Sequence, residues 1–371
     1  MSRTVIFCAD GTWNSPNQDP DEDLQADPTN VYKLFVNLAG DFSADSLRQA
    51  DEQEKSLQKD GVPVQVAKYI HGVGDSRNPI IKLLGGAFGA GIISRIVRGY
   101  TFLSRNYEPG AALVILGFSR GAYTARALAG LVASQGLLAL PLTVDREQAY
   151  RSGTQAWYRY RRSALHGFSL AHLAEVASDL PAFLSSGSLQ DSDLVPVDRI
   201  AAVAVWDTVG ALGVPEYIGQ GRRLDAFRFV DTVLSSKVGA GIHAVARDEE
   251  RMDFAPTLWD PAPNVQQVLF PGAHGDAGGG YPECGLSDGA LDWMTARLKE
   301  TGVAFAEVPA APHAPDPAGV AHRPWQHGPW PLLPHGSRTF PADLLEDPSV
   351  QARRNAGPVV PDPGCAPELY T

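Results

Sequence analysis

Five short apolar runs constrain the fold of this chain more than any other feature. They are nearly continuous in Val, Ile, Leu and Ala and do not alternate with polar residues, which is typical of strands covered on both faces. Helical patterns lie between several of them. This order predicts an α/β fold with a mostly parallel sheet, right-handed connections and helices on both faces. The runs cover residues 4–8, 66–70, 112–118, 200–206 and 265–270.

Other segments predict helices and an insertion. The charged residues 41–61 predict a surface helix, and residues 92–103 carry a helical pattern after a glycine-rich turn. Two further helical patterns, over 147–163 and 170–184, lie in a stretch without a strong strand signal. We therefore expect a helical cap over about 141–198, inserted between two strands.

The last fifth of the chain is rich in proline. After residue 308 it holds 14 of the 29 prolines, so it cannot form long helices or central strands. The length of 371 residues fits one large α/β unit with insertions. We expect one domain over 1–308 and an extension over 309–371 that wraps around it. The extension carries the large apolar residues expected to pack on that domain, Trp325, Trp330, Leu332, Leu333 and Phe340.

Charge and cysteine content exclude several classes of protein. The net charge of -11 argues against a nucleic-acid partner, because such binding needs clustered Lys and Arg. Cys8, Cys284 and Cys365 are far apart, which argues against a disulfide framework or a zinc site. The N-terminal apolar run is too short for a signal peptide. We expect synthesis in the cytoplasm, and secretion by a route that needs no cleaved signal stays open. Nothing in the sequence sets the oligomeric state.

The sharpest local motif is a strand, turn and helix around Ser119. An apolar run leads into Gly117-Phe118-Ser119-Arg120-Gly121, and an alanine-rich helical pattern follows. In this context G-x-S-x-G predicts a nucleophile elbow, in which a strained turn presents the serine at the N-terminus of a helix. Glycines on either side allow the strand and the helix to approach closely. The alternative is an N-cap serine in an ordinary β–α turn.

A serine hydroxyl needs a base, and the base needs a group that orients it. In α/β-hydrolases these residues follow in the order Ser, acid, His. Outside the predicted cap and the proline-rich extension, only His243 and His274 satisfy that order. His274 follows an apolar run in a glycine-rich loop and is the stronger candidate. His243 lies among small residues that predict a helix, where a buried structural histidine is the better interpretation.

Asp207 is the predicted acid. It stands where the run 200–206 ends, and catalytic groups of open α/β sheets gather at the carboxyl ends of strands. Asp276 lies two residues after His274 and remains the alternative, either as the acid or as a supporting residue. Chain order therefore favours Ser119, Asp207 and His274.

The loop after the first strand predicts an oxyanion hole. We expect the N–H of Gly11 or Thr12 to supply one donor and the N–H of Arg120 to supply the other. Asp10 is expected to support this loop by capping it. A phosphatase with an aspartyl nucleophile would carry a second acid two positions from it. This chain has Cys8 at that position, so the pattern of such a phosphatase is broken.

Six motifs in this order resemble one family. The chain resembles the catalytic domain of type VI secretion phospholipase effectors of the first class, a widespread α/β-hydrolase family of bacteria and fungi, over roughly residues 3–300. Residues 347–353 are also similar to the family's C-terminal end. The motifs cover residues 7–14, 69–74, 117–126, 205–213, 244–259 and 271–281.

The resemblance implies an α/β-hydrolase-like fold and a lipid esterase with Ser119, Asp207 and His274 at the triad positions. It implies phospholipids or other acyl esters as substrates, allows transient contact with a membrane surface, and requires no cofactor or metal. Two alternatives stay open. One is a metal-dependent hydrolase with Asp10, Asp207, His274 and Asp276 as ligands. The other is a non-catalytic protein that binds lipid or a partner through the same fold.

Overall fold

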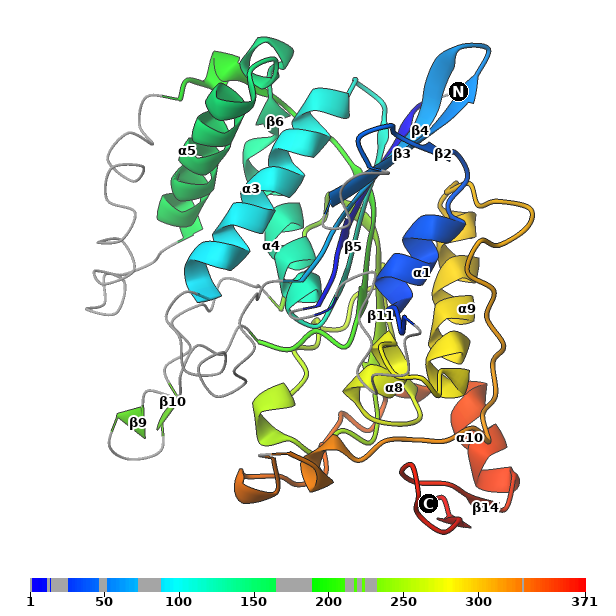
Figure 1. The fold of residues 1–371 in the computed structure, drawn as a ribbon. Coiled ribbons are helices and arrows are strands. Elements are labelled where there is room, and N and C mark those ends of the chain that lie inside the picture. Colours follow the sequence, from blue (N-terminus) through cyan, green and yellow to red (C-terminus); the bar gives the residue numbers. More distant parts are fainter. Residues whose placement is uncertain are drawn as a thin grey trace.

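One sheet of nine strands runs through the described residues, in the order β13-β12-β11-β8-β5-β1-β4-β3-β2 (Figure 1). The computed structural model describes residues 2–11, 14, 26–46, 52–72, 88–164, 189–210, 217–218, 222–223, 232–328 and 330–371. From β13 to β4 every neighbouring pair is parallel, whereas the pairs β4-β3 and β3-β2 are antiparallel. The predicted α/β fold with a mostly parallel sheet is therefore confirmed. In chain order the strands are β1 (Thr4–Ala9), β2 (Asp41–Phe42), β3 (Glu52–Lys59), β4 (Val62–Ile70), β5 (Ala112–Phe118), β8 (Ile200–Trp206), β11 (Val238–Ala246), β12 (Val265–Phe270) and β13 (Leu345–Glu346).

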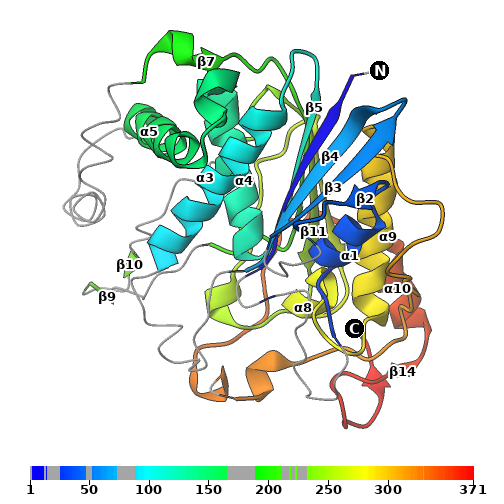
Figure 2. The same ribbon diagram turned by 45° about the horizontal axis from the view of Figure 1, so that its top comes forward.

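Helices cover both faces of this sheet (Figures 1 and 2). One face carries α3 (Phe88–Asn106), α4 (Arg120–Gln135) and α5 (Arg146–Ala164), and the other carries α1 (Asn30–Asn37) and α9 (Gly285–Glu300). Among the described residues, no helix combines the length and apolarity needed to cross a bilayer. The shorter elements are α8 (His274–Gly278), α10 (Pro348–Asn355), the 3-10 turns Leu140–Thr143, Asp191–Asp193, Met252–Phe254, Pro324–Gln326 and Trp330–Leu332, and the small pairs β6 (Leu137–Leu138) with β7 (Leu194–Val195), β9 (Tyr217–Ile218) with β10 (Arg222–Arg223), and β14 (Pro358–Val359) with β15 (Glu368–Leu369).

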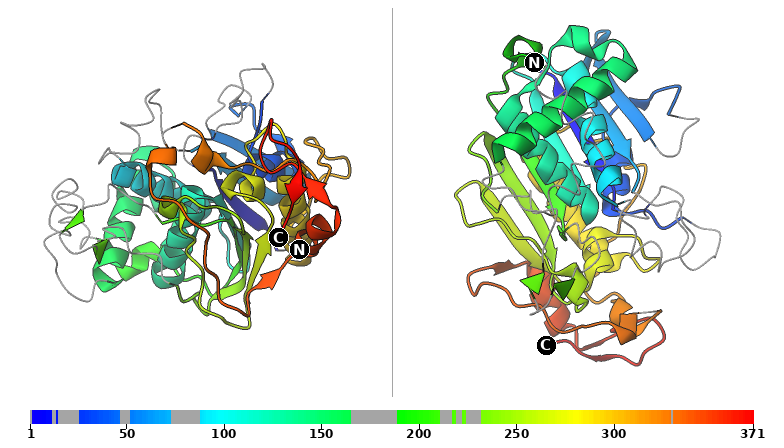
Figure 3. Two further views of the ribbon diagram at one scale, coloured as in Figure 1. Left: turned by 90° about the horizontal axis from the view of Figure 1, so that it is seen from below. Right: turned by 90° about the vertical axis from the view of Figure 1, so that its left-hand side faces the viewer.

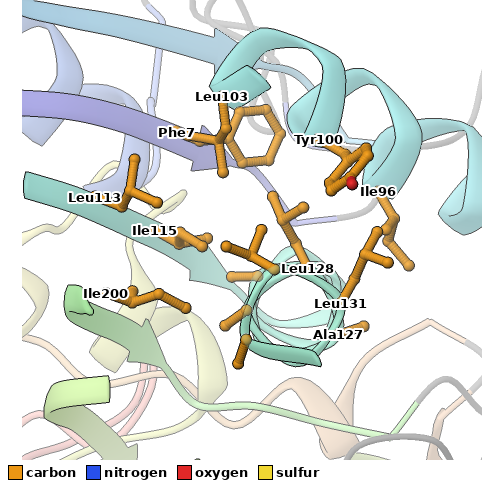
Figure 4. Close-up of a cluster of buried hydrophobic side chains, with 14 of the residues drawn as sticks. Phe7, Ile96, Tyr100, Leu103, Leu113, Ile115, Ala127, Leu128, Leu131 and Ile200 are labelled. Carbon is orange, nitrogen blue, oxygen red and sulfur yellow. The ribbon is translucent and has the colours of Figure 1, made fainter. Parts of the chain in front are cut away.

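The central strands feed two hydrophobic cores, one on each face. Alternate residues of a strand point to opposite faces, so Val5 and Phe7 of β1 join the core under α3 and α4. Ile6 and Cys8 of the same strand join the core under α1 and α9. Figure 4 shows part of the first core, where strand side chains face α3 and α4. Burial of each side chain of this size contributes about 1.5–3 kcal/mol, which explains why the central runs are apolar throughout.

The predicted surface helix over 41–61 is wrong, because part of this segment forms the antiparallel edge β2 and β3. Glu52 and Glu54 stand two residues apart and therefore share one face of β3. Both lie beside Lys68 of β4, at 2.7 and 3.2 Å from its Nζ. The charges that predict a solvated helix are thus satisfied across a strand pair instead.

The helix predicted around His243 is also wrong, because this segment is the central strand β11 between β8 and β12. Its small residues reflect crowding: a Cβ on Gly241 would lie 2.6 Å from a methyl carbon of Leu234. The His243 side chain is fully buried, and its Nε2 accepts the N–H of Thr208 at 3.1 Å. Burial lowers its pKa to about 3. His243 therefore remains a neutral structural residue.

The predicted cap region 141–198 contributes α5 to the helical layer. Trp157, Tyr158 and Tyr160 of this helix are buried in the core shared with α3 and α4. Gly153 contacts α3, since a Cβ there would lie 3.0 Å from Val97. The second predicted helix, over 170–184, lies outside the described residues.

The proline-rich extension runs across the lower end of the sheet in Figure 1, where the parallel strands finish (Figures 1 and 3). Its strand β13 pairs in parallel with β12 and adds an edge to the sheet. Arg353 of α10 is buried and donates to the carbonyl oxygens of Pro317 and Gly319 at 2.9 and 2.7 Å. Buried charge of this kind holds the extension together internally while β13 attaches it to the sheet.

Candidate active site

Ser119 stands at the turn between β5 and α4. Its φ of 58° and ψ of -122° are values that a non-glycine residue adopts only under constraint. A Cβ on Gly117 would lie 2.3 Å from the carbonyl oxygen of Gly121, and a Cβ on Gly121 would lie 2.1 Å from that of Ala9. The absence of these two side chains therefore lets strand and helix approach closely enough to hold the serine in a strained turn.

His274 and Asp207 form a buried hydrogen-bonded pair. The His274 Nδ1 lies 2.6 Å from the Asp207 Oδ2, and the two side chains are 9% and 0% exposed. Two rings pack on the imidazole, Phe118 at 4.5 Å and Phe254 at 5.0 Å between ring centroids. The His274 backbone N–H donates to the carboxylate of Glu249 at 3.1 Å. Its acid partner, the packed rings and its own backbone together fix the orientation of the imidazole.

The sheet brings the predicted residues together at the carboxyl ends of its parallel strands. Ser119, Asp207 and His274 follow β5, β8 and β12, whose carboxyl ends lie at the same end of the sheet. The Ser119 N–H donates to the carbonyl oxygen of Trp206, the residue before Asp207, at 3.1 Å. Phe118, the residue before Ser119, lies against the imidazole of His274. The loops that carry the three residues are therefore in direct contact.

The electrostatic surroundings keep the acid ionised and the imidazole neutral. Burial raises the pKa of Asp207, but the Arg338 guanidinium and the hydrogen bond from His274 outweigh it and hold this pKa below its ordinary value. Burial lowers the pKa of His274 and outweighs the opposite effect of Asp207. A neutral imidazole beside an ionised carboxylate is the arrangement that a general base requires at neutral pH.

Asp10 supports the loop after β1 from inside the protein. Its buried carboxylate accepts hydrogen bonds from the Gly11 N–H at 2.7 Å, the Thr29 hydroxyl at 2.8 Å and the Tyr69 hydroxyl at 2.6 Å. Burial raises its pKa to about 6 against the effect of these bonds. These contacts are those of a residue that caps and anchors a loop.

Two of the three predicted oxyanion-hole donors lie in the described residues. Gly11 lies beside the serine, since a Cβ on it would be 3.3 Å from the Ser119 Cβ. Its N–H is already donated to the Asp10 carboxylate. Arg120 begins α4 directly after Ser119, so its N–H belongs to the first turn of the helix. Thr12 lies outside the described residues.

Asp276 belongs to a second buried pair. Its Oδ1 lies 2.6 Å from the Nδ1 of His322, and its Oδ2 accepts the N–H groups of Ala273 at 2.8 Å and His322 at 3.0 Å. The Tyr281 ring stacks on the His322 imidazole at 3.7 Å between centroids. The structure forms the short helix α8 from His274, where the sequence predicts a glycine-rich loop. Asp276 joins this helix to the proline-rich extension, and within the described residues its carboxylate makes no hydrogen bond with the imidazole of His274.

The four residues of the metal alternative do not gather at one point. Within the residues that the structure describes, no three His, Cys, Asp or Glu side chains are placed to hold a metal ion. Asp207 and His274 bind each other, whereas Asp10 binds Thr29 and Tyr69. The carboxylate of Asp276 binds the extension.

Three further residues at the carboxyl end of the sheet were not predicted from the sequence. Arg338 binds Asp207, His322 binds Asp276, and Glu249 accepts the N–H of His274. His322 follows Ser119 and Asp207 in the chain, but its place in the proline-rich extension set it aside as a candidate. Arg338 is a single arginine among prolines and belongs to no motif. Glu249 lies within the motif 244–259, which gives it no role of its own. Only the folded chain brings these residues to the site.

A comparison with protein families decides the relationship. Residues 3–297 match the family described as "T6SS, Phospholipase effector Tle1-like, catalytic domain". The chain belongs to this family. The resemblance inferred from the six motifs is thereby confirmed, and membership of the Tle1-like family makes the chain a relative of phospholipase effectors of type VI secretion.

Individual relatives of the Tle1-like chain are distant. An uncharacterized protein of Saccharomyces cerevisiae is 24% identical over 267 residues, which cover 72% of this chain and 34% of the yeast protein. An uncharacterized protein from Pseudomonas aeruginosa, known from a crystal structure, is 19% identical with a TM-score of 0.45, covering 82% of this chain and 46% of that one. The Tle1 effector, in a structure bound to the VgrG spike of the type 6 secretion system, is 18% identical with a TM-score of 0.39, covering 76% and 52%. The chain thus spans between a third and about half of these relatives' length.

Proposed function

We propose that this chain is a serine esterase that hydrolyses acyl esters of phospholipids, with Ser119 as nucleophile, His274 as base and Asp207 as the acid that orients it. The proposal rests on one observation, the buried 2.6 Å contact between His274 Nδ1 and Asp207 Oδ2 at the sheet edge that carries the strained Ser119. Membership of the Tle1-like phospholipase effector family supports lipid esters as the substrate class and transient contact with a bilayer surface.

The proposed reaction has two halves. Ser119 Oγ attacks the ester carbonyl carbon while His274 Nε2 accepts the hydroxyl proton, and Asp207 stabilises the imidazolium that forms. The imidazolium then gives this proton to the departing alcohol, which leaves the acyl group esterified to Ser119. In the second half a water attacks the acyl-enzyme, His274 accepts its proton, and the fatty acid leaves as Ser119 recovers its hydrogen.

Negative charge on the carbonyl oxygen needs donors in both halves. We assign one donor to the N–H of Arg120, at the start of α4 and directly after the nucleophile. We assign the other to the Gly11-Thr12 loop, whose Gly11 lies beside Ser119. Since the Gly11 N–H is donated to Asp10, Thr12 is the preferred residue of the two. One such donor is worth about 3–4 kcal/mol of transition-state stabilisation.

A labelling experiment tests the proposal. A fluorophosphonate probe should react with the wild-type protein at Ser119 and abolish hydrolysis of p-nitrophenyl esters and of phosphatidylcholine and phosphatidylglycerol vesicles. The Ser119→Ala protein should lose both labelling and turnover. Ser134→Ala is the matched control, because Ser134 is an exposed residue near the far end of the same helix.

Two outcomes would contradict the proposal. Absence of labelling and turnover in folded wild-type protein would indicate a non-catalytic protein that binds lipid or a partner. Turnover that survives the probe but is lost with EDTA would indicate a metal-dependent hydrolase.

A further inference from the structure

Arg338 reaches from the proline-rich extension to the predicted catalytic acid. Its Nη1 donates to Asp207 Oδ1 at 2.8 Å and its Nη2 donates to Asp207 Oδ2 at 2.9 Å. The side chains of this ion pair are 5% and 0% exposed. A two-pronged pair of arginine and carboxylate, shielded from water, fixes both the position and the plane of the carboxylate.

The guanidinium is itself held in place. Its Nη1 also donates to the carbonyl oxygen of Ala246 at 2.6 Å, and its Nη2 donates to that of Phe254. Ala246 ends β11 and Phe254 packs on the imidazole of His274. Arg338 therefore joins three segments around the catalytic pair and cannot turn without breaking contacts to all of them.

The contacts of the Asp207 carboxylate within the described residues all restrict its orientation. Oδ1 accepts from the Ala246 N–H at 3.0 Å and from Arg338, and Oδ2 accepts from Arg338 and lies 2.6 Å from His274 Nδ1. The residue also adopts a φ of 33°, which a non-glycine residue rarely does. Because three of the four contacts come from groups other than the imidazole, these groups determine where the acid points.

We propose that Arg338 is a positioning residue for the hydrolysis proposed above: it aims the Asp207 carboxylate at His274 and limits how strongly that carboxylate favours the imidazolium. The inference rests on the proposed function. It also makes the extension part of the catalytic unit, although the family match ends at residue 297.

The charges around His274 set the direction of the expected effect. Asp207 and Glu249 favour the imidazolium, whereas Arg251 opposes it. Arg338 lowers the pKa of Asp207, and by Coulomb's law its positive charge beside the carboxylate also disfavours a positive imidazole. His243, which also lies in the field of Asp207 and Arg338, is neutral. Removal of Arg338 leaves the negative charge of Asp207 uncompensated. The imidazolium then becomes more stable and the base deprotonates only at higher pH.

The test compares pH profiles of kcat/KM for a p-nitrophenyl ester between pH 5 and 9. Arg338→Gln should lower kcat/KM by about 10–100-fold, since outer hydrogen-bond partners of this kind have effects of that size. Its acidic limb should move upward by about one pH unit. Arg338→Lys retains the charge but loses the two-pronged contact, so it should keep the wild-type limb while losing several-fold in rate.

Arg354→Gln is the matched control. Arg354 makes the same two-pronged contact with Glu346, at 2.6 and 2.9 Å, but on the surface of the same extension. The Arg354→Gln substitution should leave both kcat/KM and the acidic limb of the pH profile unchanged. Active-site titration with the fluorophosphonate probe corrects every rate for the fraction of folded enzyme.

The outcomes separate the two proposals. A wild-type protein that is never labelled at Ser119 would overturn the proposed function, and the role of Arg338 with it. If the wild type is labelled and Arg338→Gln shows the wild-type limb, the positioning role is wrong and Arg338 is purely structural. Should Arg338→Gln fail to fold, Arg338→Lys decides, because a wild-type rate in that protein would show that the two-pronged contact is not needed.

Discussion

Two buried pairs of histidine and aspartate meet at the short helix α8, and they share their geometry but differ in their surroundings. In both, a histidine Nδ1 lies 2.6 Å from a carboxylate oxygen, for His274 with Asp207 and for His322 with Asp276. The first pair stands beyond the ends of β8 and β12, whereas the second joins α8 to the proline-rich extension. Equal distances therefore do not imply equal roles.

The residues that surround each pair shift the pKa values of the two histidines in opposite directions. At His274 burial and the nearby Arg251 guanidinium outweigh the opposite effects of Asp207 and Glu249, so its pKa is lowered. At His322 burial also lowers the pKa, but the hydrogen bonds and charges of Asp276 and the nearby Glu283 outweigh it, so this pKa is raised. The first imidazole is thus prepared to accept a proton, whereas the surroundings of the second favour its protonated form, although burial also raises the pKa of the Asp276 carboxyl.

Replacement of the two histidines gives the largest expected contrast. His274→Ala should lower ester hydrolysis by about 10⁴-fold or more, because the proposed nucleophile Ser119 would lose its proposed base. His322→Ala should retain activity within about tenfold once corrected for folded protein. Initial rates with a p-nitrophenyl ester measure both. Equal losses in the two variants would mean that both pairs take part in the chemistry.

Replacement of the two acids gives the next contrast. Asp207→Asn keeps the shape but not the charge, so it should lower kcat by about 10³–10⁴-fold through the wrong imidazole tautomer and a poorly stabilised imidazolium. Asp276→Asn should change kcat only a few-fold. A larger loss in Asp276→Asn than in Asp207→Asn would transfer the role of catalytic acid to Asp276, the alternative that the sequence left open.

The second pair should matter more for stability. His322→Ala leaves the buried Asp276 carboxyl without its hydrogen bond to the His322 side chain, which should lower the free energy of unfolding by about 3 kcal/mol in urea denaturation. His313→Ala is the control, since His313 pairs with the half-exposed Asp292. That change should cost less than about 1 kcal/mol. A similar loss in both proteins would show that the second pair is no more than a surface contact.

The pH dependence of stability should distinguish the pairs most subtly. The folded-state pKa of His322 is raised above its ordinary value of 6.5, so its contribution is fully present below pH 6.5 and is lost as pH rises through the folded-state pKa. The difference in unfolding free energy between wild type and His322→Gln should therefore shrink from pH 6 to pH 9. A difference that is constant across this range would argue against a charged His322.

Parts of the fold follow from local pattern alone. The continuous apolar runs predict the central parallel strands because a strand covered on both faces needs apolar residues throughout. The same reasoning misassigned β11, where small residues are needed because neighbours such as Leu234 pack closely against the strand. It also misassigned β3, where Glu52 and Glu54 pair with Lys68 of the neighbouring strand. A single segment does not show which neighbours it will have.

The residues of the candidate site also fall into those that local sequence indicates and those that it does not. Ser119 is indicated by a motif of adjacent residues, and Asp207 and His274 are indicated by their positions after apolar runs. Arg338 could not be found in this way, since 131 residues separate it from Asp207. The partner of Asp276 was equally hidden, because His322 lies 46 residues further along among prolines.

By itself, the sequence determined where strands give way to loops and which polar side chains stand at those points, because backbone geometry and burial act over a few residues. Only the tertiary structure decided which acid each histidine received and whether its proton is given up or kept. The reason is physical: a pKa depends on burial and on charges within a few ångströms, and at this site those charges come from segments far apart in the chain, Arg338 of the extension among them.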